Sequence, residues 1–326
     1  MRRRSASSIL VSLVWLAAAP TLQADEFPRR AITIVVPYAP GGGTDLLTRI
    51  VARGLSDRFA TPVVVENRPG AGTTVAAVSV AKAPADGHLL LMGTSSTLAI
   101  NATLYKQIPY DPVRDLSPVS LVCSLPFVLV VNPALPVQGV TDLVRLAKAS
   151  PGKLNYGSGG AGSANHLFIE LFKSMTGADI AHIPYKGSSP ALSDAVAGRI
   201  QLLMSELAPA LAQIRAGRLR ALGVSSPERL TAAPDIPTLA EAGVPGYDAV
   251  SWQMLIAPGK TPRAVLEKLS VETNAIVRSP EVSQQFVKLG LVPIGRGSPD
   301  ELAVFVKTEI GRWGRVVQQA GVAGSE

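Results

Sequence analysis

Two glycine-rich stretches are the part of the sequence best suited to bind a small anion. The first is Pro40-Gly41-Gly42-Gly43, and the second runs from Gly157 to Ser163 as GSGGAGS. Glycines leave backbone N–H groups accessible, and a helix start carries partial positive charge, so such loops bind carboxylates or phosphates without a charged side chain. One such loop is often only a tight turn, whereas two of the same layout favour a site that grips its ligand from both sides.

Each loop lies between a predicted strand and a predicted helix. Residues 32–38 (ITIVVPY) form a short β-branched run typical of a buried parallel strand, and residues 154–156 (LNY) precede the second loop. We expect Thr44 to cap the first helix, with Asp45 in its first turn, where negative charge suits the helix dipole. Both helices have an apolar face at helical spacing, formed by Leu46, Leu47, Ile50, Val51, Leu55 and Phe59 in the first and by Leu167, Phe168, Leu171, Phe172 and Met175 in the second.

The same order of elements continues after each loop. Residues 62–73 lead to a helix and the strand of residues 88–96, and residues 179–190 lead to a helix and the strand of residues 201–206. Strands that alternate with helices in this way indicate an α/β fold. The internal repeat therefore predicts two α/β lobes whose glycine loops face each other.

The middle and the end of the chain indicate how the lobes are connected. The apolar run of residues 125–133 is expected to be a strand that leaves the first lobe. Ser298 to Glu301 form a capping box that opens the last helix, and the helices after residue 260 are expected to pack on the first lobe. We therefore place lobe 1 at residues 25–124 and 248–326 and lobe 2 at residues 125–247, with crossings near Leu125 and Tyr247.

The first 24 residues have the layout of a cleaved secretory signal. Arg2, Arg3 and Arg4 precede the apolar run ILVSLVWLAAA, and a short polar stretch ends at Ala24. The run falls short of the roughly 20 residues that span a bilayer, so a membrane anchor is disfavoured. We expect an exported, periplasmic protein, cleaved near Ala24, that does not itself span the membrane.

Charge and composition argue against several classes of function. Cleavage would remove three of the 31 basic residues and none of the 24 acidic ones, which leaves a formal charge of only +4. The basic residues are scattered and 5% of the chain is aromatic, so no nucleic-acid partner is expected. The single cysteine, Cys123, excludes an internal disulfide, and His88, His166 and His182 lack the spacing of a metal site.

The second glycine loop also allows an enzymatic interpretation. Residues 157–162 read G-x-G-x-x-G between a strand and a helix, which is the fingerprint of dinucleotide binding, and Asp179 lies at a tolerable distance downstream. The first loop lacks this pattern. No Walker lysine follows either loop, and no G-x-S-x-G elbow is present, so catalytic residues for hydrolysis are missing. We predict a binding protein, and a dinucleotide-binding enzyme remains the remote alternative.

Ten ordered stretches resemble the Bug-type (TctC-like) solute-binding proteins of the tripartite tricarboxylate transporters. They cover nearly the whole mature chain and include FPRRAITIVVPYAPGGGTD, VVVENRPGAGTTVAA, PGKLNYGSGGAGSANHLFIELFK and PDIPTLAEAGVPGY. The resemblance implies a two-lobed, type II-like periplasmic binding protein, each lobe a mixed, mainly parallel sheet flanked by helices, with the ligand in the cleft. It further implies a small carboxylate ligand, no cofactor, no catalysis, a monomer, and transient contact with integral membrane permease subunits. A periplasmic carboxylate sensor acting on a membrane signalling partner would need the same pocket and stays an alternative.

The resemblance also implies which residues contact the ligand. The two loops would hold a carboxylate through backbone amides, and hydroxyl groups and a tyrosine would form further walls. Family members often carry Phe-Asp where this chain has Ser205-Glu206, so a second ligand carboxylate would be repelled there, or an amine would be paired. The complete predicted set is Tyr38, Ala39, Pro40, Gly41, Gly42, Gly43, Thr44, Asp45, Thr94, Ser95, Ser96, Ser158, Gly159, Gly160, Ala161, Gly162, Ser163, Tyr185, Gly187, Ser188, Ser205 and Glu206.

Overall fold

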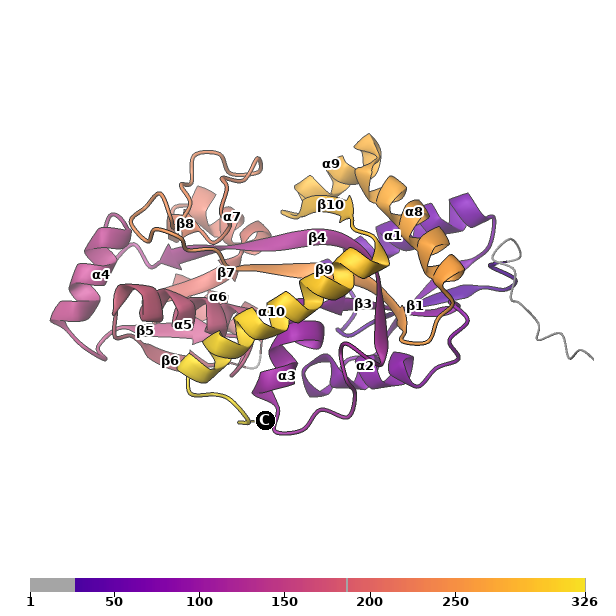
Figure 1. Ribbon diagram of the computed structural model, residues 1–326. Helices are drawn as coiled ribbons and strands as arrows, with labels where there is room; N and C mark the ends of the chain where they lie inside the picture. The colour runs from indigo at the N-terminus through magenta and orange to yellow at the C-terminus, as the bar shows by residue number, and fades with distance from the viewer. Residues whose placement is uncertain (1–26, 186, 326) are drawn as a thin grey trace, which may run out of the picture.

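A computed structural model describes residues 27–185 and 187–325 (Figure 1). The predicted signal sequence lies outside the described residues. The chain folds into alternating strands and helices, as the repeat predicted. The first part contains β1 (Ile32–Val36), α1 (Gly43–Phe59), β2 (Val63–Asn67), η2 (Ala71–Thr73), α2 (Thr74–Ala81), β3 (Leu89–Thr94), η3 (Ser96–Ile100) and α3 (Asn101–Leu104).

The long strand β4 (Leu116–Val131) connects the first part of the chain to the second. The second part contains α4 (Val140–Ala149), β5 (Asn155–Ser158), α5 (Ala164–Thr176), β6 (Ala181–Pro184), α6 (Ser188–Val196), β7 (Leu202–Glu206), α7 (Leu207–Arg215) and β8 (Arg220–Val224). The chain then returns through β9 (Val250–Pro258), α8 (Arg263–Arg278), α9 (Pro280–Lys288), β10 (Val292–Arg296) and α10 (Pro299–Gln319).

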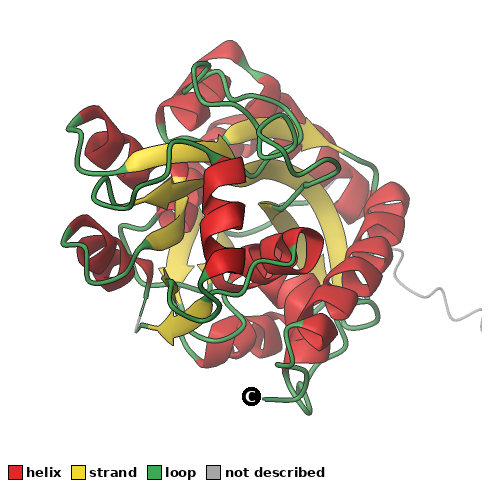
Figure 2. Cartoon of the chain, turned by 90° about the vertical axis from the view of Figure 1, so that its left-hand side faces the viewer, coloured by secondary structure: helices red, strands yellow, loops and turns green. Residues whose placement is uncertain are grey.

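The strands form a mixed sheet in the order β2-β1-β3-β9-β4-β7-β5-β6, with β10 and β8 also paired to β4. Parallel pairing is confined to the two outer sets, β2-β1-β3 and β6-β5-β7, and every pairing of β4 or β9 is antiparallel. The parallel share is therefore smaller than predicted. Figure 2 shows the strong curvature of the strands and the helices packed around them.

β4 changes its partners halfway along its length. Its residues up to Pro126 pair with β9, whereas Phe127 to Val131 pair with β7. This change falls within two residues of the crossing predicted near Leu125. The strand begins at Leu116, nine residues before the predicted strand, and shifts in register after Pro118 accommodate the missing proline N–H.

Apolar residues of the two glycine-flanked helices form much of the core, as their spacing predicted. Leu47, Val51 and Leu55 of α1 are buried against β1, β3 and α8, while Leu46 at the edge of this face is 41% exposed. In α5, Leu167, Phe168 and Phe172 are buried. Burying a side chain of this size contributes about 1.5–3 kcal/mol, so these faces hold each helix, and the loop before it, against the sheet.

The last helix, α10, contacts both halves of the molecule, whereas the tail helices were expected to pack on the first lobe. It begins with the predicted capping box of Ser298 and Glu301 and runs diagonally across the front of Figure 1. Its Trp313 is fully buried and stacks on Phe168 of α5, with 5.3 Å between ring centroids. Toward the other half, Gly314 packs against Thr103 of α3. The remaining tail elements, α8, α9 and β10, pack beside α1 and β4.

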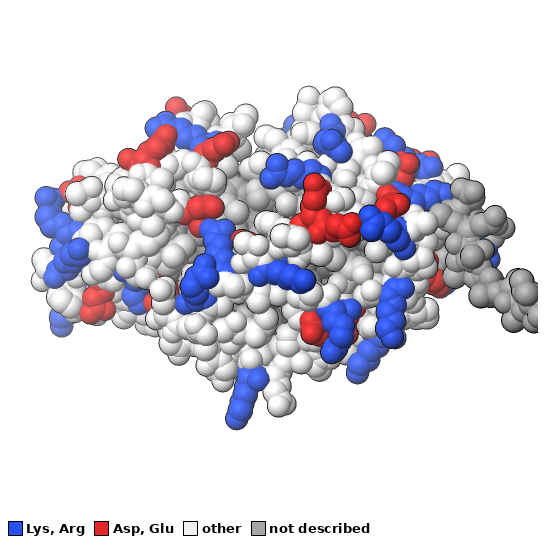
Figure 3. Space-filling model, viewed as in Figure 1, with Lys and Arg blue, Asp and Glu red and all other residues white. Residues whose placement is uncertain are grey.

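The surface carries interspersed charges. Figure 3 shows lysines and arginines mixed with acidic residues on the face it displays, without a continuous basic stripe. Among the described residues, no helix is both long and apolar enough to cross a membrane.

Candidate ligand-binding cavity

A cavity of about 700 Å³ lies where the glycine loops of the two halves meet. Both halves supply its walls, as the facing loops predicted. The residues that line it are Tyr38, Ala39, Pro40, Gly41, Gly42, Gly43, Thr44, Ser96, Leu125, Phe127, Gly159, Ser163, Ala164, Asn165, Gly187, Ser188, Ser189, Glu206, Ser251 and Gln253.

Thirteen of the residues proposed from the sequence lie in this lining and nine do not. The thirteen are Tyr38, Ala39, Pro40, Gly41, Gly42, Gly43, Thr44, Ser96, Gly159, Ser163, Gly187, Ser188 and Glu206. The residues outside the lining are Asp45, Thr94, Ser95, Ser158, Gly160, Ala161, Gly162, Tyr185 and Ser205. Several of the nine hold lining residues in place, as their contacts below show.

Three helices begin at the cavity wall. α1 starts after its N-cap Gly42, α5 after its N-cap Ser163 and α6 after its N-cap Gly187, and all three caps line the cavity. The first N–H groups of an α-helix have no acceptor within the helix, and the helix dipole adds partial positive charge at this end. The three starts therefore supply backbone donors and positive potential to one cavity, which suits a carboxylate.

The first loop is held by Asp45 rather than by Thr44. The helix begins at Gly43, so Thr44 lies inside its first turn and no side chain caps the N-terminus, contrary to the expected cap. Asp45 instead accepts hydrogen bonds from the Gly41 N–H (2.9 Å) and from Arg49, and Asn67 donates to it as well. Burial alone would raise the pKa of Asp45, but these donors lower it below its usual value. Asp45 is thus a positioning residue, ionised and buried behind the loop.

The second loop already uses most of its own N–H groups. Gly159 donates to the Asn165 side chain (3.1 Å), Gly160 to the Ser158 hydroxyl (3.1 Å), and Gly162 to Nδ1 of His166 (3.0 Å). Amides bound in this way are not free for a ligand. The free donors on this side are those at the start of α5, where Ala164 and Asn165 line the cavity. These two residues directly follow the predicted loop.

A stack of rings supports the second loop from behind. His166 stacks on His182 (4.0 Å between centroids), which stacks on Tyr156 (4.8 Å). The Ser158 hydroxyl lies 2.6 Å from Nε2 of His182. Burial, and then the neighbouring His182, lower the pKa of His166 to about 4. His166 is therefore neutral at pH 7, and its Nδ1 accepts the Gly162 N–H, in keeping with the local packing role predicted for it.

The floor of the cavity was not predicted from the sequence. It consists of Leu125 and Phe127 on β4 and of Ser251 and Gln253 on β9, at alternate positions of each strand. Alternate residues share a face of a strand, so these four point the same way. They look like ordinary strand residues in the sequence, and the signal that could have found them is their place at the two predicted crossings.

The predicted hydroxyl cluster after β3 is divided between the cavity and its support. Ser96 lines the cavity, whereas the Thr94 hydroxyl lies 3.4 Å from that of Tyr38 and the Ser95 hydroxyl 2.9 Å from that of Ser251. In lobe 2, Tyr185 donates to Asp194 instead of reaching the ligand space. Ser205 precedes Glu206 on β7 and therefore points to the opposite face of that strand.

The described lining contains no lysine, arginine or histidine, and its ionisable side chains are Tyr38 and Glu206. Burial, with the charge of Glu206, raises the pKa of the Tyr38 phenol, while the hydroxyls of Thr94 and Ser96 act in the opposite direction. Burial also raises the pKa of Glu206. No group of three or more potential metal ligands occurs among the described residues, so the site's chemistry is that of amides, hydroxyls and one carboxyl.

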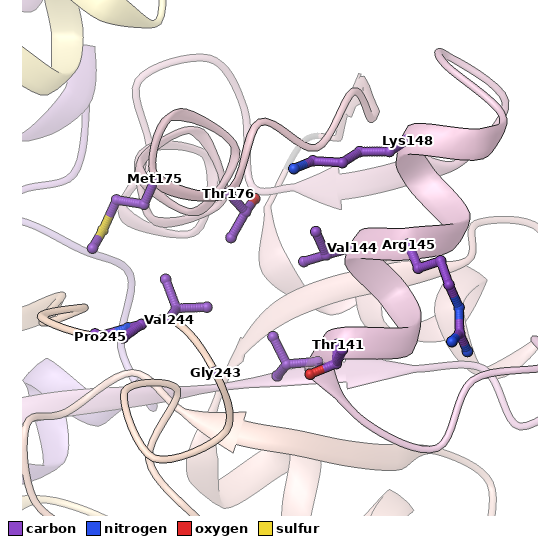
Figure 4. A pocket seen from close by; sticks show the side chains of 10 residues that line it. Thr141, Val144, Arg145, Lys148, Met175, Thr176, Gly243, Val244 and Pro245 are labelled. Carbon is purple, nitrogen blue, oxygen red and sulfur yellow. The ribbon is translucent and has the colours of Figure 1, made fainter.

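A second pocket of about 570 Å³ lies on the outer side of lobe 2 and shares no residue with the cavity. Figure 4 shows Val144 and Lys148 of α4 facing Met175 and Thr176 at the end of α5, with Val244 and Pro245 below, while the Arg145 side chain points away from them. No helix begins with a glycine loop there except at the N-cap Gly139 of α4, which does not line the pocket. This pocket therefore lacks the converging donors of the cavity.

Comparison with known proteins identifies the family. The sequence profile described as "Tripartite tricarboxylate transporter family receptor" (TctC) matches residues 47–322. Protein BugT of Bordetella pertussis is 40% identical over 305 residues, covering 93% of each chain. The solved structure "R. palustris Rpa4515 with adipate" has a TM-score of 0.82 at 39% identity, covering 91% of this chain and 99% of that one.

A second solved structure carries a different ligand. "MatC (Rpa3494) from Rhodopseudomonas palustris with bound malate" has a TM-score of 0.77 at 31% identity and covers 89% of this chain and 100% of that one. These likenesses confirm the two-lobed periplasmic-binding-protein fold. The chain belongs to the TctC family of tripartite tricarboxylate transporter receptors, the Bug-type periplasmic solute-binding proteins.

Proposed function

We propose that the protein captures a small carboxylate in the cavity between its two lobes in the periplasm and delivers it to the membrane permease of a tripartite tricarboxylate transporter, without catalysis. The observation that carries this proposal is the convergence of the starts of α1, α5 and α6 on one cavity whose described lining has no basic side chain. Adipate in Rpa4515 and malate in MatC support a carboxylate as the ligand class.

The same geometry suggests how binding changes the shape of the protein. A carboxylate held by α1 from residues 25–124 and by α5 and α6 from residues 125–247 would contact both proposed lobes, so its binding free energy favours the closed state. β4 and the segment before β9 connect the lobes and are the proposed hinge. The closed form is what we propose the permease recognises.

A thermal-shift screen of the chain without residues 1–24 tests the carboxylate proposal. The panel contains mono-, di- and tricarboxylates, aromatic carboxylates, acidic amino acids and NAD. A ligand at about 100 times its dissociation constant adds about 2.7 kcal/mol to the unfolding free energy, which raises Tm by a few degrees. We expect this shift with at least one carboxylate and none with NAD. A shift with NAD alone would contradict the proposal.

A further inference from the structure

Glu206 has an unusual position for a carboxyl group in a cavity built to attract carboxylates. It is the last residue of β7 and the N-cap residue of α7, and it lines the cavity together with Phe127, its partner on β4. Its side chain does not cap α7. Since strand neighbours opposite each other point to the same face, Glu206 and Phe127 lie side by side at the lobe 2 end of the floor.

No described residue neutralises this carboxyl group. The structure gives its side chain no hydrogen bond and no ion pair within residues 27–185 and 187–325, and burial is the cause that raises its pKa. The charge of Glu206 acts across the cavity on Tyr38, from the loop after β1 in the other lobe, and raises the pKa of its phenol. Glu206 is partly buried, and an ionised carboxyl group in such a place is stabilised by a nearby cation or hydrogen-bond donor, which a ligand in the cavity can supply.

Gln253 is a second unsatisfied polar group in the same cavity. Its side chain is 2% exposed, and its Oε1 is buried without a hydrogen-bond partner among the described residues. It lies on β9 and lines the cavity two positions from Ser251. Buried polar side chains are nearly always hydrogen-bonded, so Gln253 marks a point next to the cavity where the described residues leave an acceptor without a donor.

The free donors and acceptors of the cavity are therefore of two kinds. The starts of α1, α5 and α6 offer N–H donors for one carboxylate, whereas the Glu206 carboxyl group offers acceptor oxygens that have no donor among the described residues. From this arrangement we infer that the ligand carries an ammonium group in addition to its carboxylate, and that Glu206 is the residue that selects this aminocarboxylate class over dicarboxylates. The inference rests on the proposed function and names the substrate class of the same site.

A dicarboxylate would meet a different environment. Its second carboxylate would approach Glu206 as a like charge, and two such groups at one site cannot both remain ionised without a large penalty. Binding would then require uptake of a proton. Dicarboxylate affinity should therefore rise as pH falls through the raised pKa of Glu206, while aminocarboxylate affinity should fall over the same range because the ammonium group needs the ionised carboxylate.

Tyr38 is the other titratable side chain of the described lining, and it stays neutral throughout this range because its pKa is raised above its usual value. Lys186 lies outside the described residues. The opposite pH slopes of the two ligand classes, compared with the slopes for the Glu206→Gln variant, therefore report on the carboxyl group of Glu206.

Isothermal titration calorimetry tests the inference on the mature chain. The probes are α- and ω-aminocarboxylates of three to six carbons, dicarboxylates of the same lengths, and unsubstituted monocarboxylates. The best aminocarboxylate should bind at least tenfold more tightly than the matching dicarboxylate. Glu206→Gln, which keeps the shape and removes the charge, should weaken aminocarboxylate binding about 30-fold and leave monocarboxylate binding within threefold. Glu228→Gln, at an exposed acid outside the lining, serves as the matched control and should change neither.

Results other than these contradict either the inference alone or both the inference and the proposed function. If dicarboxylates bind the wild-type protein more tightly than aminocarboxylates, or if Glu206→Gln leaves aminocarboxylate binding intact, the inference is wrong while the proposed function stands. Equal pH slopes for the two classes would contradict it in the same way. If none of the three classes binds but another carboxylate of the thermal-shift panel does, the inference fails and the proposed function stands; if no carboxylate of either panel binds, both fail.

Discussion

Replacing Gly42 with valine should weaken carboxylate binding by about 100-fold while the protein remains folded. Gly42 is the N-cap residue of α1, its backbone is extended (φ −78°, ψ 169°), and an added Cβ would have no heavy atom nearer than 4.0 Å. Valine therefore fits the backbone, but its methyl groups would fill the space in front of the first N–H groups of the helix. Losing charge-assisted hydrogen bonds worth about 1.5–3 kcal/mol corresponds to this change in affinity.

Gly139→Val is the matched control for this substitution. Gly139 is the N-cap residue of α4, also has an extended backbone, and has open space at its Cβ position, but it does not line the cavity. Titration calorimetry with the carboxylate found by thermal shift should give wild-type affinity for this control. Circular dichroism and urea unfolding verify that both variants fold. Unchanged affinity in Gly42→Val would remove the start of α1 from the site.

Replacing His166 with phenylalanine should reduce the loss of stability in mild acid. The pKa of about 4 in the folded protein lies below the usual 6.5, so between these values the unfolded chain binds more protons than the folded one. The stabilising contribution of neutral His166 is fully present above pH 6.5 and is lost as pH falls toward 4. From pH 7.5 to 5.0 this residue should account for about 2 kcal/mol of lost unfolding free energy.

Urea unfolding of the wild type and the variant at both pH values measures this contribution. Phenylalanine preserves a ring in the stack with His182 but cannot accept the Gly162 N–H. The variant should therefore be less stable at pH 7.5, because a buried donor is left without a partner, and its stability should depend less on pH. His182, whose pKa is lowered as well, remains in both proteins, so some pH dependence should persist in the variant. Equal pH dependence would show that His166 does not titrate as described.

The strand, loop and helix that form one wall of the cavity were predictable because residues close together in the sequence determine them. The run ITIVVPY and the spacing of Leu47, Val51 and Leu55 specify a buried strand and an amphipathic helix, and the structure contains both as β1 and α1. The glycines between them form a loop at the helix start, and this loop does not depend on contacts with distant parts of the chain. The capping box at Ser298 was predictable for the same reason, since its four residues contain all the necessary groups.

Features that depend on distant partners were not predictable in this way. Pro118 and Pro126 argue against a strand, yet both lie in β4, because bulges and changes of partner remove the need for their missing N–H groups. The stacking of Trp313 on Phe168 is a contact between residues far apart in the sequence, and so the position of α10 across both halves was missed. The cavity floor was missed for the same reason, because it exists only where β4 and β9 pair.

The second glycine loop shows where local reasoning about a site was insufficient. Its sequence offers several N–H groups, but Asn165, Ser158 and His166 accept three of them, and two of these acceptors come from the helix that follows. A glycine loop indicates where donors can be free. The acceptors packed behind it decide which donors remain, and in this protein those are at the first turn of α5.

Backbone amide NMR during titration with the bound carboxylate tests the central claim most directly. The claim is that the ligand lies at the starts of α1 and α5, so the largest ¹H–¹⁵N shifts should occur at Gly43, Thr44, Ala164 and Asn165, the first residues of these helices. Smaller shifts should accompany them along β4 as the lobes close. Shifts centred instead on the outer pocket between α4 and α5, at Val144, Lys148 and Val244, with the four helix-start amides unmoved, would contradict it.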